Sequence, residues 1–280
     1  MRANSVLVLY SLLIASACSS KPESTNAPPT QNSPVVVQPG TESGATQNVS
    51  IDSPDGLRIA GSFFASSTPN SPSLLLLHQW QSNRHSYDDF AKRMQSKGFN
   101  VLSIDGRGFG ESTKKSDGTS VAAERSDEAV NAMLRDVDAA VSFLTKQKNV
   151  DPKRIGIVGA SYGSSLAIMY AADHPDIRAV ALLSPGLNYF GNMQTRPAVE
   201  EYRGRDLFVV ASKGDTESAQ AVEGLTIGDT RHGFMVLPVG SYHGTDMFKY
   251  RDKTDGPPVV EDALESFLMT RMGLKEAGYK

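Results

Sequence analysis

The sequence of 280 residues is poor in cysteine and in tryptophan, with one of each. A single cysteine excludes an internal disulfide framework and any cysteine-rich zinc or iron–sulfur site. There is no excess of basic residues, because 28 Lys and Arg side chains against 31 Asp and Glu side chains leave a net charge of −3. This balance excludes a strongly basic surface and makes nucleic acid a poor candidate partner. Paired-histidine metal motifs such as H-E-x-x-H are also missing, so we expect no metal and no cofactor.

The N-terminal apolar run is too short to span a membrane. Residues 1–17 carry one early charge, Arg2, then about ten apolar residues and a small-x-small triplet that ends at Ala17, whereas a transmembrane helix needs roughly 20 apolar residues. This order of features is typical of a cleaved export signal. The sequence therefore predicts a signal peptide over residues 1–17.

The only cysteine, Cys18, directly follows this triplet. Its position resembles the lipobox of bacterial lipoproteins, in which the thiol is diacylated and becomes the mature N-terminus. Lipoboxes usually have leucine where this chain has Ala15. The resemblance implies an exported lipoprotein of the cell envelope, held to the membrane through Cys18. The alternative is a secreted or periplasmic soluble protein, cut at the same bond by an ordinary signal peptidase.

Residues 18–47 consist mainly of Ser, Thr, Pro, Asn, Gln and Gly. Such a segment buries too little apolar surface to fold, and we expect a disordered tether with a span of about 30 Å. The remaining residues, 48–280, have the length of one globular domain.

In that domain, short apolar runs alternate with helical stretches. The turn residues 53–56 separate two alternating segments and predict an N-terminal antiparallel hairpin. Further strands are expected at 73–78, 101–105, 155–160, 179–184, 207–211 and 234–237, and helices at 87–97, 126–148, 164–173 and 259–272. This alternation predicts an α/β fold with a mostly parallel sheet and helices on both faces. Functional residues should then lie beyond the carboxyl ends of the strands.

A G-x-S-x-G motif occupies residues 159–163, between an expected strand and an expected helix. In this setting the serine lies on a strained turn that exposes its hydroxyl, and the glycines leave room for the neighbouring strand and helix. Ser161 is therefore the candidate nucleophile.

A serine hydroxyl needs a general base, and with this type of motif the chain order is Ser, acid, His. His78 and His85 precede Ser161, which leaves three later histidines. His174 ends the helix after the motif, where a helix C-terminus favours it, and His232 precedes the last strand, at the wrong end of the sheet. His243 follows that strand and is the expected base.

The base needs a carboxylate to hold its tautomer. The loop after residues 179–184 has no acidic residue, whereas the loop after residues 207–211 contains Asp215, with Glu217 as the nearest competitor. We therefore expect Asp215 to be the acid. The oxyanion would be bound by the backbone N–H of Tyr162 and by one N–H of the loop His78-Gln79-Trp80.

These residues resemble those of the α/β-hydrolase superfamily, and the resemblance covers residues 49–272. The His-Gln after the first parallel strand, the segment 105–112 and His243-Gly244 resemble the cap-less dienelactone-hydrolase-like branch. That branch carries a cysteine nucleophile where this chain has Ser161, which implies ester hydrolysis. Many relatives have His-Gly where this chain has His78-Gln79, and alignment with that loop favours Trp80 over Gln79 as the second donor.

The sequence thus predicts a serine esterase for small or soluble esters, with an α/β-hydrolase fold and no lid domain, because only about 20 residues separate Ser184 from Asp206. A peptidase of the prolyl-oligopeptidase type and a lipid-tethered scaffold without activity are the alternatives. The S-x-x-K spacing of residues 112–115 lies in loop sequence and is not expected to be catalytic. The acyl and alcohol groups and the oligomeric state are not encoded in any pattern that we identify.

Overall fold

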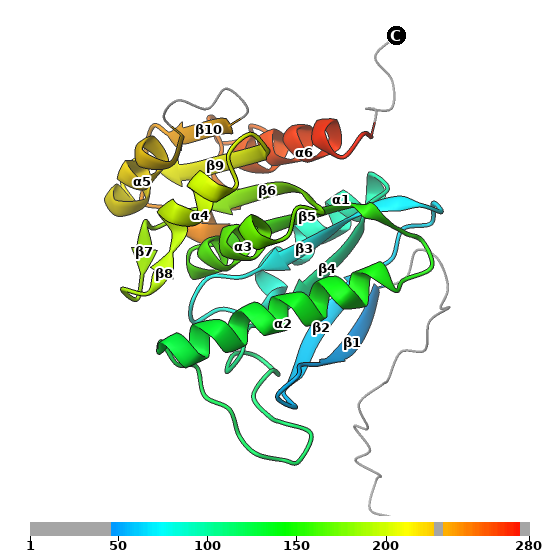
Figure 1. Cartoon of the computed structure of the whole chain (residues 1–280). Coiled ribbons are helices and arrows are strands. Elements are labelled where there is room, and N and C mark those ends of the chain that lie inside the picture. The colour runs from blue at the N-terminus through cyan, green and yellow to red at the C-terminus, as the bar shows by residue number, and fades with distance from the viewer. Residues whose placement is uncertain (1–45, 227–231, 275–280) are drawn as a thin grey trace, which may run out of the picture. The chain divides into compact units, whose positions relative to one another are not determined.

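A mixed β-sheet forms the centre of the computed structural model, which describes residues 46–226 and 232–274 (Figure 1). The strand order is β1-β2-β4-β3-β5-β6-β9-β10. The strands are β1 (Thr46–Asp52), β2 (Arg58–Phe64), β3 (Ser71–Leu77), β4 (Asn100–Ile104), β5 (Val150–Ala160), β6 (Ile177–Leu183), β9 (Asp206–Ser212) and β10 (His232–Leu237). β1 and β2 are antiparallel and β2 is antiparallel to β4, while all later pairs are parallel. The expected hairpin and parallel sheet are confirmed.

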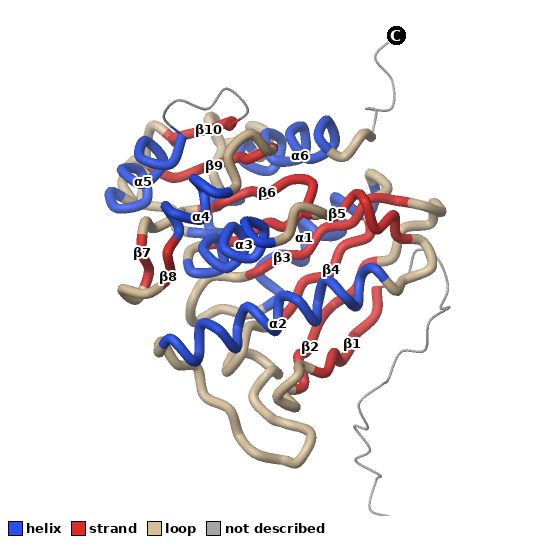
Figure 2. Tube along the Cα trace, in the orientation of Figure 1, coloured by secondary structure: helices blue, strands red, loops and turns tan. Residues whose placement is uncertain are grey.

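Helices cover both faces of this sheet (Figure 2). They are α1 (Asp88–Ser96), α2 (Asp127–Thr145), α3 (Tyr162–Asp173), α4 (Thr195–Glu201), α5 (Thr216–Thr226) and α6 (Val259–Arg271), with the 3₁₀ turns η1 (Arg84–Tyr87) and η2 (Gly244–Lys249). One apolar core lies between the sheet and α2, α3, α4 and α5, and a second lies between the sheet and α1, η2 and α6. Within the described ranges, no helix has the length and apolar character needed to cross a membrane.

The local sequence explains where the longest helix begins. The Ser126 hydroxyl accepts the backbone N–H of Ala129 at 3.2 Å, and Asp127 and Glu128 occupy the first turn. A side-chain cap and acidic residues both stabilise a helix N-terminus. The buried residues of α2 then recur at helical spacing, from Val130 to Leu144, which fixes the face that packs on the sheet.

Residues 185–205, which connect β6 to β9, contain secondary structure of their own. They form a short hairpin, β7 (Asn188–Tyr189) with β8 (Met193–Gln194), followed by α4. Neither this hairpin nor α4 nor α5 is expected from the sequence. The segment is still too short for a lid domain, and it matters because it contributes Tyr189 and Phe190 to the site described below.

The expected signal peptide (1–17), the lipidation site Cys18 and nearly all of the expected tether lie outside the described residues. The last two residues assigned to the tether, Thr46 and Gln47, belong to β1 and pair with Phe64 and Phe63 of β2. These two residues therefore belong to the sheet and not to the tether that the sequence predicts.

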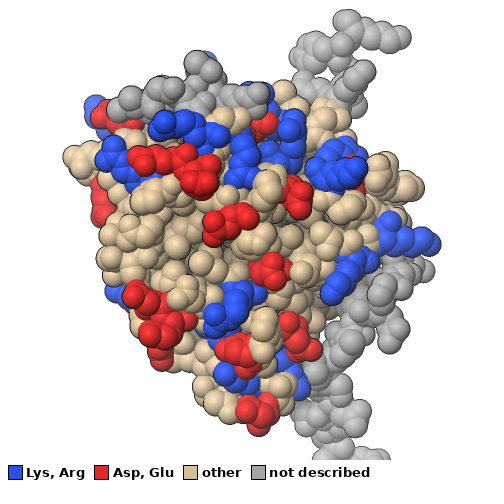
Figure 3. Space-filling view, in the orientation of Figure 1, with Lys and Arg blue, Asp and Glu red and all other residues tan. Residues whose placement is uncertain are grey.

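Charges of both signs are interspersed on the face drawn in Figure 3. This distribution agrees with the near-neutral composition. A polyanion binds best to a continuous basic surface, and this face of the described domain does not have one.

Candidate active site

Ser161 follows the last residue of β5 and directly precedes α3. Its backbone is strained, with φ 54° and ψ −123°, and its N–H donates to the Leu183 carbonyl of β6 at 2.8 Å. A non-glycine residue with positive φ is uncommon and such strain often marks a functional site. The N-terminus of α3 begins at the next residue, Tyr162, so the positive end of its dipole faces this position.

The two glycines of the motif are required by backbone contacts. A Cβ on Gly159 would lie 2.1 Å from the Gly163 carbonyl oxygen, and a Cβ on Gly163 would lie 2.6 Å from the carbonyl oxygen of Leu77. Because these neighbours are backbone atoms of the strand and helix, they cannot move aside at small cost. This confirms the prediction from the sequence that a side chain at either glycine would collide with the neighbouring strand or helix.

Asp215 and His243 lie together at the carboxyl end of the sheet. Asp215 follows β9, His243 follows β10, and the His243 Nδ1 to Asp215 Oδ2 distance is 2.7 Å. The Gly214 N–H donates to the Gly240 carbonyl at 2.8 Å, which joins the two loops. The nearest sequence competitor, Glu217, lies in the first turn of α5.

The histidine loop also reaches the nucleophile strand. Gly244, next to His243, has φ 57°, and a Cβ there would be 3.3 Å from the Cβ of Ala160, which precedes Ser161. The structure therefore brings Ser161, Asp215 and His243, which are distant in sequence, to the same edge of the sheet. His243 keeps 41% of its side chain exposed, whereas Asp215 keeps 16%.

The environment of Asp215 keeps it ionised. Burial alone would raise its pKa, but hydrogen bonds from His243 and from the hydroxyls of Ser218 and Ser184 lower that pKa below its usual value. An ionised carboxylate beside Nδ1 favours the tautomer with the proton on Nδ1, which leaves Nε2 as a proton acceptor. This is the arrangement that a general base requires.

The other candidate histidines lie elsewhere. His174 caps the C-terminus of α3, stacks on Tyr170 at 3.7 Å and bonds the Tyr170 carbonyl through Nδ1. His232 is the first residue of β10 and pairs with Leu207 at the start of β9, at the amino end of the sheet. Neither is in position to act on Ser161.

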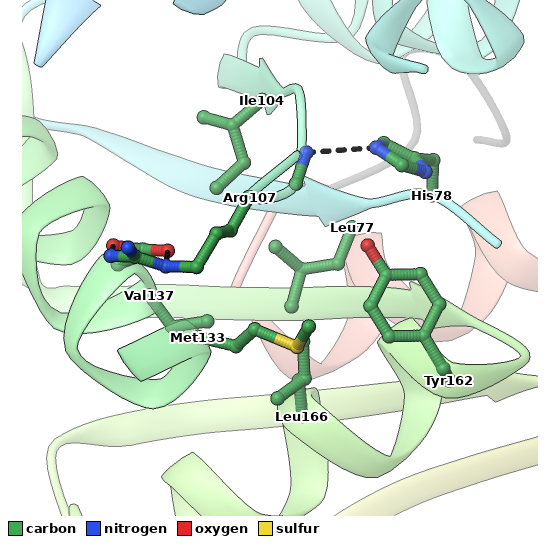
Figure 4. Close-up of a pocket in the computed structure, with 10 residues that line it drawn as sticks. Leu77, His78, Ile104, Arg107, Met133, Val137, Tyr162 and Leu166 are labelled. Carbon is green, nitrogen blue, oxygen red and sulfur yellow. Dashed lines mark hydrogen bonds and ion pairs between the residues drawn. The ribbon is translucent and has the colours of Figure 1, made fainter. Parts of the chain in front are cut away.

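His78 orders the loop that follows β3. Its Nδ1 lies 2.7 Å from the Gln79 carbonyl, and its Nε2 accepts the Gly106 N–H at 2.8 Å. Since Nε2 accepts, Nδ1 must carry the proton and donate it to Gln79. Burial lowers the pKa of His78 more than the Gln79 carbonyl and Asp105 raise it, so the ring stays neutral. Figure 4 shows this bond at the edge of a small pocket, with the Tyr162 hydroxyl pointing toward the same region.

Backbone donors remain available near Ser161. Among the described residues, the N–H groups of Gln79, Trp80 and Tyr162 all lack a hydrogen-bond acceptor. The Gln79 side chain is held by the histidine loop, because its Oε1 accepts from the Thr245 hydroxyl at 3.1 Å. The loop named from the sequence is thus next to the nucleophile.

Aromatic side chains form one wall of the site. The Trp80 ring lies 4.7 Å from Phe109, 5.3 Å from Tyr162 and 4.8 Å from Phe190. Tyr189 donates its hydroxyl to the Ser184 carbonyl at 2.9 Å and lies within hydrogen-bonding reach of Ser161. Sequence reasoning missed Tyr189 and Phe190, because no local pattern indicates that the β7–β8 hairpin folds back onto this edge.

The glycine-rich segment 105–112 is structural, as its sequence suggests. Asp105 is fully buried and pairs with Arg84, and a Cβ on Gly108, where φ is 79°, would lie 2.1 Å from the Ala123 backbone nitrogen. No group of three or more potential metal ligands occurs within residues 46–226 and 232–274.

Comparisons with known proteins relate this geometry to that of known hydrolases. Residues 68–205 match the model of the Hydrolase_4 family, described as serine aminopeptidase, S33. Two solved structures have the same fold: the esterase Pf2001 of Pyrococcus furiosus, with a TM-score of 0.62 at 18% identity over 86% of this chain and 97% of that one, and the dienelactone hydrolase of Anabaena variabilis, with 0.58 at 16% over 81% and 98%. The described domain therefore has the α/β-hydrolase fold.

Curated relatives match a shorter part of the chain. The uncharacterised protein Rv2307c of Mycobacterium tuberculosis is 29% identical over 50% of this chain and 46% of its own length. The thiohydrolase aneE of Aspergillus aculeatus is 26% identical over 59% of this chain and 50% of its own length. The chain spans about half the length of the curated relatives it matches.

Proposed function

We propose that the protein is a serine hydrolase that cleaves carboxylic esters through an acyl-enzyme. The observation that carries the proposal is the hydrogen-bonded Asp215–His243 pair at the strand edge where Ser161 lies in a strained turn. The esterase and thiohydrolase names among similar proteins support hydrolysis of an acyl bond.

In the proposed reaction, His243 Nε2 takes the Ser161 proton as Oγ attacks the ester carbonyl. Asp215 holds the Nδ1 proton and stabilises the imidazolium. The tetrahedral intermediate then collapses, the ester C–O bond breaks, and His243 gives its proton to the leaving alcohol. A water molecule, activated in the same way, hydrolyses the acyl-enzyme and returns Ser161 to its starting state.

Peptide geometry favours Trp80 over Gln79 as the second oxyanion donor. In a planar trans peptide, the carbonyl and the following N–H point in opposite directions. The Gln79 carbonyl is held by the His78 ring at 2.7 Å and by the Ser82 N–H at 3.2 Å. The Trp80 N–H is therefore directed away from His78, and with the Tyr162 N–H it would bind the oxyanion.

We infer that the substrates are small esters with an apolar group. The aromatic wall of Trp80, Phe109 and Phe190 borders the site, and such rings favour an apolar acyl or alcohol group. Peptide hydrolysis is a second candidate, supported by the description of the matching family model. A panel of p-nitrophenyl esters of increasing chain length, run beside amino-acid p-nitroanilides, separates the two.

Labelling with a fluorophosphonate tests the proposed nucleophile. We expect the full chain to be labelled at Ser161, because the probe reacts with activated serines, and to lose that label when His243→Ala removes the base. Peptide mapping of the labelled residue is the measurement. A folded chain that takes up no label would support the scaffold without activity and contradict the proposal.

We also propose that Cys18 attaches the exported protein to a membrane, which rests on the sequence pattern of residues 1–18. Two acyl chains give stable membrane binding, whereas a single chain gives marginal binding. We expect the wild type to enter the detergent phase on phase separation and Cys18→Ala to remain in the aqueous phase. Aqueous partitioning of both would contradict the anchor.

A further inference from the structure

Ser184 directly follows β6 and is fully buried. Its φ is 50°, close to the 54° of Ser161 at the end of the neighbouring strand β5. Its N–H donates to the Val210 carbonyl at 2.8 Å, so the strained turn is held in the sheet. For a buried serine in the left-handed region, surrounding contacts must compensate the strain.

The Ser184 side chain contacts both loops that carry the proposed acid and base. Its Oγ accepts the Gly244 N–H, next to His243, at 2.9 Å. The same hydroxyl lies close to the Asp215 carboxylate and contributes to the lowered pKa of that group. Ser184 thus lies close to both Asp215 and Gly244, which follow it in the chain by 31 and 60 positions.

The direction of each bond follows from donor and acceptor chemistry. The Gly244 N–H can only donate, so Ser184 Oγ must accept there, and the one hydroxyl proton is left for another partner. An ionised carboxylate can only accept. We assign that proton to the nearby Asp215 carboxylate, so that one hydroxyl links the acid on one side to the backbone beside His243 on the other.

We propose that Ser184 is a positioning residue that sets the Asp215–His243 contact. It does not touch the substrate, and the inference rests on the proposed function, in which that contact orients the base. Other hydrogen bonds also join the two loops, from Lys213 to Leu237, from Gly214 to Gly240 and from the Ser212 hydroxyl to Gly240, but they involve neither Asp215 nor His243. Ser184 acts at Asp215 and Gly244 themselves.

Kinetics of Ser184→Ala and Ser184→Gly test the proposal. We expect kcat to fall about tenfold to a hundredfold in both, the range for a lost hydrogen bond with an unpaired buried N–H, while KM stays within about threefold. Glycine adopts a positive φ without strain, so we expect Ser184→Gly to remain folded even if Ser184→Ala does not. An unchanged kcat in a folded Ser184→Gly would overturn the proposal.

Ser112→Ala is the matched control. Ser112 is also fully buried, and its Oγ accepts a backbone N–H, that of Ala60, at 2.9 Å, but it has no contact with Asp215 or His243 among the described residues. We expect this variant to lose thermal stability and to retain kcat. An equal loss of kcat in Ser112→Ala would overturn the positioning role and assign the effect to general loosening.

A double-mutant cycle separates positioning from a merely structural role. If Ser184 acts through Asp215, then adding Ser184→Gly to the Asp215→Asn variant should lower kcat further by a factor of less than about three. A full additional loss would overturn the proposal.

A readout without turnover distinguishes this inference from the proposed function. The Nδ1 proton bound between His243 and Asp215 should give a downfield NMR resonance in the wild type and in Ser112→Ala, and the resonance should broaden or vanish in Ser184→Gly. That result supports the inference even if the wild type proves unable to hydrolyse esters, which would contradict only the proposed function. An unchanged resonance in Ser184→Gly would overturn the inference.

Discussion

Ser161→Ala is expected to lower kcat for short p-nitrophenyl esters by several orders of magnitude, approaching about 10⁶-fold if the three residues act as a unit. In the proposed mechanism, the variant removes the atom that forms the acyl-enzyme and leaves the proposed oxyanion donors in place. Alanine is smaller than serine and the site is 6% exposed, so the fold should persist. Initial rates under saturating ester, with circular dichroism as a check on folding, are the measurement.

Ser165→Ala, on helix α3 directly after Ser161, is the control for this experiment. Ser165 is buried and its hydroxyl is 2.6 Å from that of Thr195, away from the Asp215–His243 pair. We expect it to affect stability and to leave kcat close to the wild-type value. If Ser161→Ala kept turnover within about tenfold of the wild type, then either another residue would be the nucleophile or the acyl-enzyme mechanism would be wrong.

The sequence predicts those parts of the site that are marked by a local motif or that follow from the order of strands and loops along the chain. The strand-turn-helix around Ser161 is local, because a side chain at Gly159 would collide with Gly163, only two residues after the nucleophile. Chain order and the position of each loop after a strand predict Asp215 and His243, and the structure brings these two side chains into contact. Parallel strands bring their carboxyl ends to one edge, so the order of elements is enough to bring these two loops near each other.

The missed parts depend on contacts between distant segments. Ser184 carries no motif, and its role arises only when the turn after β6 meets residues 31 and 60 positions later. Tyr189 and Phe190 enter the site because the β7–β8 hairpin, whose strands have two residues each, folds back toward Trp80. Periodicity over two-residue strands is too short to detect, since a period of 2 needs several residues to be distinguished from chance. Residue types alone do not reveal such placements.

The buried ion pairs of Arg107 give the largest expected effect on stability. Arg107, 7% exposed, donates to Asp136 at 2.7 Å and 2.9 Å and to the partly exposed Asp55 at 2.7 Å, and Ser53 donates to Asp136 at 2.5 Å. Figure 4 shows the Arg107 side chain extending away from His78. Breaking a buried pair by removing one partner leaves an uncompensated charge, which costs about 3–5 kcal/mol.

Arg107→Met should therefore lower the free energy of unfolding by about 3–5 kcal/mol at pH 7, or Tm by on the order of 10 °C. Burial already raises the pKa of Asp136, and loss of the guanidinium raises it further. A folded-state pKa above the unfolded value means that the folded variant binds the proton more tightly, so its deficit is largest at neutral pH and shrinks as the pH falls toward that pKa.

Urea unfolding of Arg107→Met and of Arg107→Met/Asp136→Leu at pH 7 and pH 5 tests this account. The double variant should recover most of the lost stability, because it removes the orphaned carboxylate and replaces the pair with apolar side chains of similar volume. Its remaining deficit should also depend less on pH, since the group whose pKa moved is gone. A deficit in Arg107→Met that is equal at both pH values, and that the second substitution does not reduce, would mean that lost packing by the arginine stem, rather than the buried charge of Asp136, sets the cost.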